Sequence, residues 1–250
     1  MVEVPLKDVA SDSEHWAGAA AQWIAWARAP NHDAFWAYRD ALADYLGTAT
    51  GRALDVGCGE GRVSRLLKAC GYTVAAVDPV AELVTAAEQA QSAHDYAIAP
   101  ARELPFENES FDLVVAYNVL MDVVDVPEAL REIKRVLRRD GTLFISIVHP
   151  LADLELLAET GPNAPSDAHA TYFDRRRFET KVESRGLTMH FAGWAQPLEA
   201  YVGALESAGF AITSLREPAA DLREGRDHMS RWSGLPLFLW LKAKLLPSHT

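Results

Sequence analysis

The sequence predicts a doubly wound α/β fold, in which helices cover both faces of a largely parallel sheet. Three observations support this prediction. Segments of strand and helix character alternate from residue 52 to residue 148, as in successive βαβ units. The strand segments are almost continuously apolar, so both of their faces are expected to be covered. A glycine-rich loop follows the first strand and opens a helix, at the edge where such sheets bind ligands.

Length, composition and charge narrow the classes of protein. The 250 residues, 49% of them apolar, suffice for one domain, with or without an insertion, and disfavour an intrinsically disordered chain. The formal net charge of −11 disfavours nucleic acid and anionic membranes as partners. No apolar run approaches the roughly 18 residues of a membrane span, and the first residues lack the pattern of a secretion signal. A cytoplasmic location is therefore expected.

The two cysteines, Cys58 and Cys70, form no Cys-x-x-Cys pair, which disfavours a disulfide scaffold and a cysteine-built zinc site. No group of His and Asp residues has the spacing of metal ligands, so no metal is expected. The oligomeric state stays open.

Residues 1–47 are expected to form a helical cap. Ser11 and Glu14 match the Ser-x-x-Glu capping box, which predicts a helix from that point to Arg28. A second helix is predicted to end at Leu46. Helical spacing relates three tryptophans that belong either to the core or to a pocket wall: Trp16, Trp23 and Trp26.

Strand and helix segments follow in order through residues 48–149. Strands are predicted at residues 52–57, 72–78, 96–99, 111–117 and 142–148. Helices are predicted between them at residues 60–70, 81–92 and 127–139. Gly71 ends the first of these helices, and Pro127 lies in the first turn of the last.

Residues 150–196 interrupt this alternation and are predicted to form a lid, because the segment is longer than an ordinary connection. Its run of three arginines, residues 175–177, is either a solvated surface or a site for an anionic substrate. Residues 197–250 are predicted to complete the core with a helix at 197–208 and closing strands at 210–215 and 235–241.

The loop after the first strand contains Gly57, Gly59 and Gly61, whose small size lets a ligand approach the backbone closely. A dinucleotide-binding loop would need its third glycine at Arg62. Asp55 and Glu60 would also repel a diphosphate. The two acids are better matched to a ligand that carries positive charge.

Asp78 ends the second strand, where a carboxylate can accept hydrogen bonds from both hydroxyls of a ribose. Pro79 follows it and offers an apolar edge to an adenine. The pair therefore indicates a nucleoside, without deciding which one.

These residues resemble the class I S-adenosylmethionine-dependent methyltransferases, in particular the type 11 subgroup near the ubiquinone/menaquinone-type and small-molecule enzymes. Residues 55–61 match the first motif of that family, and Asp78 matches its ribose-binding acid. Residues 104–112 and 129–137 match the segments before the fourth and fifth strands. The resemblance covers residues 50–148. It implies a Rossmann-like sheet of seven strands with the last strand antiparallel, and S-adenosylhomocysteine as the product.

The motifs and the strand ends together assign a set of residues to the cofactor. Asn118 is expected beside its methionine end. In this chain Ala101 and Arg102 stand where the family often has an acid that contacts the adenine. The full set is Asp55, Gly57, Cys58, Gly59, Gly61, Asp78, Pro79, Ala101, Arg102, Tyr117 and Asn118.

Methyl transfer to an oxygen or nitrogen nucleophile is helped by a general base, and histidine titrates near neutral pH. His149, at the end of the fifth strand, is the first candidate, and His32 in the cap is the second. A packing role is open for both. Four residues are candidates for the binding of a small-molecule acceptor or for ordinary packing of the lid: Trp26, Tyr172, His190 and Trp194.

Two other functions are compatible with parts of the sequence. A non-catalytic module that binds S-adenosylmethionine would share the glycine loop and Asp78. An NAD(P)-dependent oxidoreductase would share the acid at the second strand, but Asp55 and Arg62 disfavour it.

Overall fold

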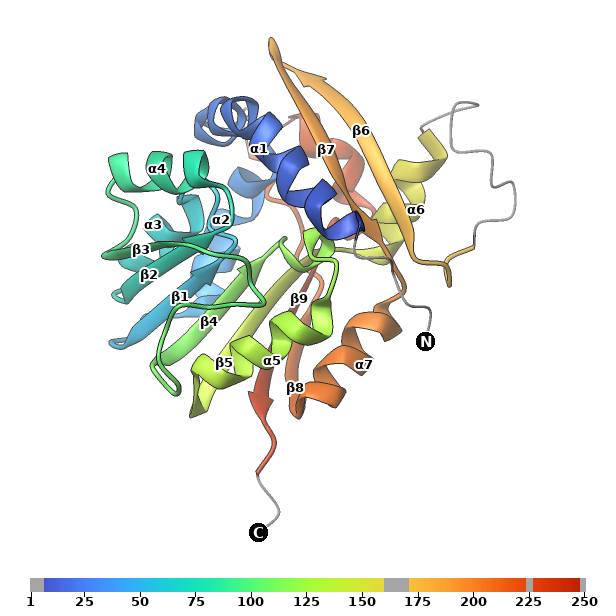
Figure 1. The fold of residues 1–250 in the computed structure, drawn as a ribbon. Coiled ribbons are helices and arrows are strands. Elements are labelled where there is room, and N and C mark those ends of the chain that lie inside the picture. Colours follow the sequence, from blue (N-terminus) through green and yellow to red (C-terminus); the bar gives the residue numbers. More distant parts are fainter. Residues whose placement is uncertain (1–6, 160–170, 224–226, 248–250) are drawn as a thin grey trace.

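A seven-stranded sheet forms the centre of the molecule (Figure 1). The structure is a computed structural model that describes residues 7–159, 171–223 and 227–247. The strand order is β3-β2-β1-β4-β5-β9-β8, with parallel pairing from β3 to β5 and with β9 antiparallel to both of its neighbours. The predicted fold class is therefore confirmed. The strands are β1 (Arg52–Val56), β2 (Thr73–Asp78), β3 (Asp95–Ile98), β4 (Phe111–Tyr117), β5 (Leu137–Val148), β8 (Phe210–Arg216) and β9 (Phe238–Leu245).

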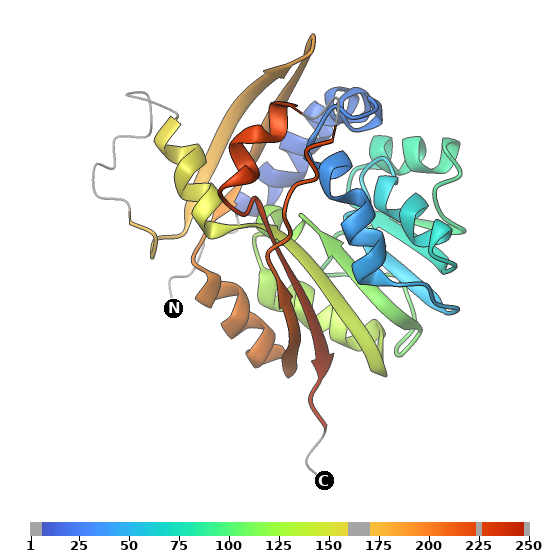
Figure 2. The same ribbon diagram turned by 180° about the vertical axis from the view of Figure 1, so that it is seen from behind.

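Helices cover both faces of this sheet (Figure 2). One face packs against α5 (Val126–Val136) and α7 (Leu198–Ala208), and the other against α2 (Ala34–Leu46) and α3 (Arg62–Ala69). Side chains alternate between the two layers along β4: Val114 belongs to the first and Val115 to the second. The nearly continuous apolar run of β4 thus reflects burial on both sides.

Three predicted boundaries are wrong. The helix α1 (Lys7–Arg28) already includes Lys7, so Ser11 lies inside the helix and does not begin it; no helix-breaking residue separates the two positions. The helix α5 ends at Val136, because Leu137 pairs with Phe111 and starts β5. The last strand runs to Leu245, beyond the predicted end at Leu241, because its second half pairs with β8.

The segment of residues 150–196 that was predicted to be a lid contains a β-hairpin that was not predicted from the sequence. The strands β6 (Arg176–Ser184) and β7 (Leu187–Ala195) pair antiparallel, and α6 (Pro150–Glu159) precedes them. Arg185 and Gly186 join them with φ angles of 47° and 81°, as in a two-residue hairpin turn. Apolar residues alternate along both strands, which was the available signal: Phe178 and Val182, then Leu187, Met189 and Phe191. The predicted lid also includes residues 160–170, which lie outside the described residues.

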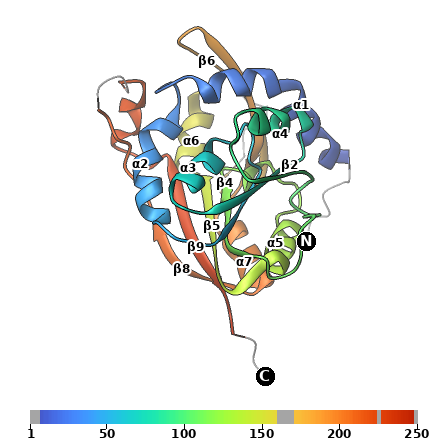
Figure 3. The same cartoon turned by 90° about the vertical axis from the view of Figure 1, so that its left-hand side faces the viewer.

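The helix α1 packs between this hairpin and α4 (Ala81–Gln89), over the carboxyl ends of β1 and β2 (Figure 3). Trp26 of α1 and Met189 of β7 are buried in one apolar cluster. Trp23 belongs to that cluster and also contacts the one formed by Val80 and Leu83 beside α4. The described tryptophans of α1 are therefore packed side chains that join the cap, the hairpin and the sheet.

Candidate functional site

The loop between β1 and α3 has a backbone that requires glycine. Gly57 and Gly61 have φ angles of 68° and 90°, in the left-handed region. A Cβ atom at Gly57 would lie 1.8 Å from Cγ2 of Val119, and one at Gly61 would lie 2.3 Å from Oγ of Ser92. The loop is thus held tightly between the end of β4 and the end of α4.

Asp78, at the carboxyl end of β2, braces this loop. Its Oδ2 accepts a hydrogen bond from the backbone N–H of Gly59 at 2.9 Å, and its Oδ1 accepts one from Val80 at 2.9 Å. The side chain is almost fully buried, and burial raises the pKa of its carboxyl to about 6, against the lowering effect of the two backbone donors. Each carboxylate oxygen keeps a second lone pair, so the residue can still accept hydrogen bonds from a ligand.

Asp55, in the adjacent strand β1, is also buried, and its Oδ2 accepts a hydrogen bond from the hydroxyl of Ser64 at 2.6 Å. Burial raises the pKa of its carboxyl, the hydrogen bond from Ser64 lowers it, and the nearby charge of Asp78 raises it; together these effects bring the pKa to about 7. Its contact is therefore with α3. A positively charged ligand near Asp55 stays a prediction.

The raised pKa of Asp55 has a consequence for stability. Between about pH 4 and pH 7 the folded state holds a proton that the unfolded state has lost, so this residue makes the protein less stable as the pH rises. Asp55→Asn removes the effect and keeps an oxygen for Ser64. We compare the unfolding free energy of the variant with that of the wild type. As the pH rises from 5 to 7.5, this difference is expected to shift in favour of the variant by about 1 kcal/mol or more. Urea denaturation at both pH values measures it; a difference that does not change with pH would contradict the prediction.

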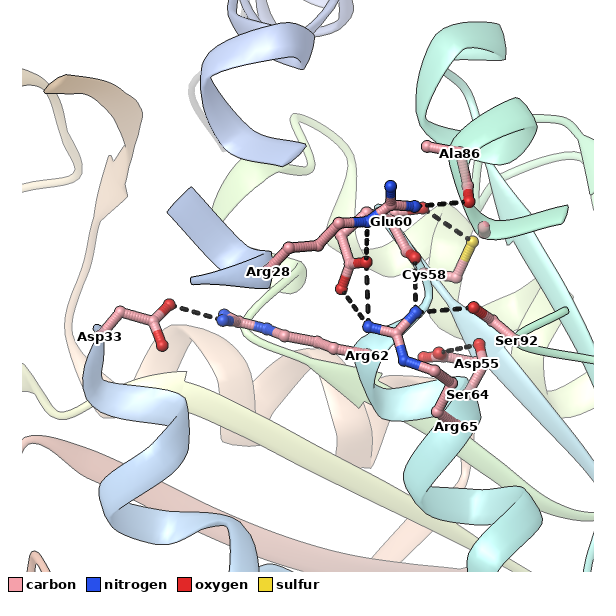
Figure 4. A network of polar contacts seen from close by, with 12 residues as sticks. Arg28, Asp33, Asp55, Cys58, Glu60, Arg62, Ser64, Arg65, Ala86 and Ser92 are labelled. Atoms are coloured by element: carbon pink, nitrogen blue, oxygen red, sulfur yellow. Dashed lines mark hydrogen bonds and ion pairs between the residues drawn. The ribbon is translucent and has the colours of Figure 1, made fainter. Parts of the chain in front are cut away.

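Glu60 is the centre of a polar network (Figure 4). Its buried carboxylate accepts hydrogen bonds from Nε of Arg28 at 3.0 Å and from Nη2 of Arg65 at 2.7 and 2.9 Å. Arg28 also donates to the carbonyl of Ala86, and Arg65 to the hydroxyl of Ser92. The prediction that Glu60 suits a positively charged ligand is wrong, because two arginines of the chain itself neutralise it.

Arg62, directly after the loop, links the loop to the cap. Its Nη1 lies 2.5 Å from Oδ2 of Asp33 (Figure 4), and its guanidinium lies 4.6 and 4.7 Å from the ring centres of Trp23 and Phe35. A Cβ atom at Gly59 would meet Nε1 of Trp23 at 2.9 Å. The cap helices therefore lie directly on the loop.

Two residues at the end of β4 lie beside the loop. Tyr117 is buried, and its hydroxyl has no hydrogen-bond partner within the part of the chain that the structure describes. Burial raises the pKa of that hydroxyl. Asn118 has a φ angle of 53°, and its Oδ1 accepts a hydrogen bond from the hydroxyl of Ser146 at 2.6 Å. The side-chain oxygen of Asn118 thus links the end of β4 to β5.

The two candidate bases differ in their surroundings. The Nε2 of His149 lies 3.0 Å from Oε1 of Glu217, and its Nδ1 accepts the backbone N–H of Leu151 at 3.1 Å. The neutral ring therefore carries its proton on Nε2, and its lone pair is on Nδ1, so the contact with Leu151 must open before His149 can take a proton. His32 is 3% exposed, and its Nε2 is buried without a partner among the described residues. Burial lowers its pKa, and the charge of Asp33 opposes this effect.

The remaining predicted cofactor residues come from three loops: Cys58 from the glycine loop, Pro79 from the segment after β2, and Ala101 and Arg102 from the segment after β3. Cys58 is buried in the loop, and burial raises the pKa of its thiol. Pro79 is exposed, and Ala101 packs against the layer formed by α5 and α7. Arg102 forms an ion pair with Glu103 at 3.4 Å.

The four residues predicted to bind an acceptor fall into two places. Trp26 and His190 lie at the interface of α1 and β7: Trp26 packs on His32 with 4.3 Å between ring centres, and Nδ1 of His190 lies 3.0 Å from Oε1 of Gln22. The other two lie near the base of the hairpin. The hydroxyl of Tyr172 accepts the backbone N–H at the start of α7, and Trp194 stacks under Arg175 at 4.1 Å.

Within residues 7–159, 171–223 and 227–247, no three His, Cys, Asp or Glu side chains are grouped closely enough to hold a metal ion. None of the helices in these ranges is both long and apolar enough to cross a membrane.

Comparison with known proteins shows which proteins this chain is similar to. Residues 54–145 match the family model described as a methyltransferase domain. The malonyl-[acyl-carrier protein] O-methyltransferase of Salmonella typhimurium is 29% identical over 213 residues, which cover 84% of this chain and 79% of the relative. A ubiquinone biosynthesis O-methyltransferase of Xanthomonas oryzae pv. oryzae is 32% identical over 127 residues. That match covers 49% of this chain and about half, 53%, of the relative.

Solved structures show the same fold at low identity. A Haloferax volcanii methyltransferase in complex with the Trm112 activator has a TM-score of 0.64 at 17% identity and covers 97% of this chain and 99% of its own. The 1,6-didemethyltoxoflavin-N1-methyltransferase of Burkholderia thailandensis, solved with S-adenosylhomocysteine, has a TM-score of 0.58 at 18% identity and covers 98% and 94%. The match to the family model spans the glycine loop, the strand that ends at Asp78 and the end of β4, so this part of the chain contains a methyltransferase domain similar to those of S-adenosylmethionine-dependent methyltransferases.

Proposed function

We propose that this methyltransferase transfers the methyl group of S-adenosylmethionine to an oxygen, nitrogen or carbon nucleophile of a small molecule and releases S-adenosylhomocysteine. The observation that carries the proposal is the bracing of the glycine loop by Asp78 at the carboxyl end of β2. The names of the relatives support an acceptor whose methylated group is small: one is an O-methyltransferase of malonyl-[acyl-carrier protein], one an O-methyltransferase of ubiquinone biosynthesis, and a structural neighbour is an N1-methyltransferase of 1,6-didemethyltoxoflavin.

The residues at the loop fit the donor molecule. The backbone between Gly57 and Gly61 would line its centre, and Asp78, with its remaining lone pairs, would accept the ribose hydroxyls. Pro79, Ala101 and Arg102 would flank the adenine. The methionine end would lie toward Tyr117 and Asn118, at the end of β4. The buried, partnerless hydroxyl of Tyr117 is the observation that favours this placement.

The donor supplies a methyl group already activated by its sulfonium, so the protein has to position the acceptor and exclude water. The side chains of α1 are suited to excluding water, because Trp23 covers Gly59 and Trp26 closes the interface with β7. For an acceptor that loses a proton, His149 is our proposed base; its Nδ1 must first release the backbone N–H of Leu151, while Nε2 can keep its contact with Glu217.

We propose that the cap of residues 1–47 and the lid of residues 150–196 form the acceptor side of the enzyme, and residues 48–149 and 197–250 the donor side. A groove of about 510 Å³ lies between α1 and the hairpin, lined by His190, Phe191, His15 and Gln22 among others. It lies next to the cluster that contains Trp26, on the side of α1 that packs against the hairpin.

Titration calorimetry with S-adenosylhomocysteine and with NADH tests which of the two nucleotides the protein binds. We expect binding of S-adenosylhomocysteine and none of NADH; the reverse would support the oxidoreductase alternative. Incubation with methyl-labelled S-adenosylmethionine and a panel of phenols, amines and carboxylic acids then separates an enzyme from a binding module. Cofactor binding with no labelled product from any of them would favour the module.

A further inference from the structure

Two cations lie side by side on one face of the sheet, across the strands β8 and β9. Arg216 of β8 pairs in register with Trp240 of β9, and Ser214 pairs with Lys242. Paired residues of neighbouring strands share a face of the sheet, and so do residues two apart on one strand. The four side chains therefore form a square on one face. Trp240 packs in the layer of α2, so the square lies on the α2 side.

Neither cation of the square has an acidic partner within residues 7–159, 171–223 and 227–247. Arg216 donates to the carbonyl of Leu215 at 2.8 Å, and Nζ of Lys242 donates to that of Tyr45 at 2.5 Å. Burial lowers the pKa of Lys242, and the charge of Arg216 lowers it further. The hydroxyl of Ser214 has no hydrogen bond to the described residues. In a chain of net charge −11, this square thus holds two positive charges that no described carboxylate neutralises.

The ring of Tyr45, in the last turn of α2, borders the square. Nζ of Lys242 lies 4.3 Å from the centre of this ring, and the guanidinium carbon of Arg216 lies 5.7 Å from it. Trp240 stacks on the same ring with 5.9 Å between ring centres. Arg216 is exposed, and Ser214 and Lys242 are half-buried, so a dissolved ion can reach all three. The aromatic contacts thus hold both charges where one small anion can meet them.

We propose that Ser214, Arg216 and Lys242 form a binding site for a phosphate group, as the free ion or as a monoester. Such a group carries about 1.5–2 negative charges near pH 7, which matches the two cations, and its oxygens accept several hydrogen bonds at once. The guanidinium, the ammonium and the hydroxyl are all donors. A carboxylate carries a single charge and fewer acceptor oxygens, so it is expected to bind more weakly.

The proposed phosphate site is separate from the glycine loop. Asp33, which pairs with Arg62 beside the loop, precedes α2, whereas Tyr45 lies in the last turn of that helix. A helix rises about 1.5 Å per residue, so about 18 Å separate the two positions. Phosphate and the methyl donor are therefore expected to bind independently, and the proposal does not rest on the proposed function.

Titration calorimetry at constant ionic strength tests the site with inorganic phosphate, glycerol 3-phosphate and acetate. The wild type is expected to bind the phosphates at least about tenfold more tightly than acetate. Arg216→Met is expected to lower the phosphate affinity about tenfold. Arg39→Met is the matched control: Arg39 also lies over an aromatic ring, that of Trp36 at 5.5 Å, but its charge is paired with Asp40. That variant is expected to keep the affinity within twofold.

The outcomes separate the possible ligands. Tighter binding of glycerol 3-phosphate supports a monoester as the ligand, and tighter binding of inorganic phosphate supports the free ion. Ser214→Ala is expected to weaken either by about threefold, without a change in melting temperature when phosphate is absent. A wild type that binds neither phosphate, or that binds acetate as tightly, overturns the proposal, and so do equal losses in Arg216→Met and Arg39→Met. Displacement of phosphate by S-adenosylhomocysteine also overturns it, because the ion would then lie at the glycine loop.

Discussion

Asp78→Asn is expected to weaken the binding of S-adenosylhomocysteine by about 1.5–3 kcal/mol, or roughly 10- to 150-fold. The carboxylate of Asp78 accepts two backbone N–H groups, one of them from the glycine loop itself. An asparagine keeps the shape but turns an NH2 group toward one of those donors, and it has no charge to strengthen hydrogen bonds to the ribose. Both the loop and the ribose contact are therefore expected to suffer.

Asp95→Asn is the control for this prediction. Asp95 lies on the neighbouring strand β3, but its side chain is 61% exposed, and its ion pair with Arg52 is long, at 3.7 Å. The same change of charge there is expected to leave the affinity within twofold. Calorimetry on both variants distinguishes the outcomes: equal affinities of Asp78→Asn and the wild type would remove Asp78 from the donor site.

Glu60→Ala is expected to lower the free energy of unfolding by about 2–4 kcal/mol. The carboxylate is fully buried, and its removal leaves Arg28 and Arg65 without the partner that both share. These arginines are 39% and 37% exposed, so water recovers part of their solvation, and the loss is expected below that of a fully buried pair. Because Arg28 ends α1, the cap is also expected to loosen over the glycine loop.

Urea denaturation measures this loss, with Glu128→Ala as the control. Glu128 also pairs with an arginine, Arg131, but on the surface of α5, where such a pair contributes about 0.2–1 kcal/mol. Similar losses for the two variants would show that the Glu60 network does not hold the cap to the loop. Faster hydrogen exchange in α1 of Glu60→Ala would locate the loosening directly.

The parts of the molecule that were predictable depend on residues close together in the chain. The alternation of strand and helix, the glycine loop and the acid that ends β2 are local patterns, and each has a local physical cause: burial on both faces, a left-handed φ angle, or a position at a strand end. The hairpin formed by β6 and β7 also consists of residues that are close together in the chain. The alternation of apolar and polar residues along its strands and the Arg185-Gly186 turn were present in the sequence. They were not recognised as a hairpin among the many charged residues of this segment.

What the sequence determined by itself is the fold class and the family that the glycine loop resembles. Both are visible as patterns among residues that are close together in the chain. What only the tertiary structure decided is which charges remain available to a ligand. Glu60 meets Arg28 from 32 residues away, Asp33 meets Arg62 from 29, and His149 meets Glu217 from 68. A charge at a site is defined by the partners that folding brings to it, and such distant pairings leave no pattern in neighbouring residues.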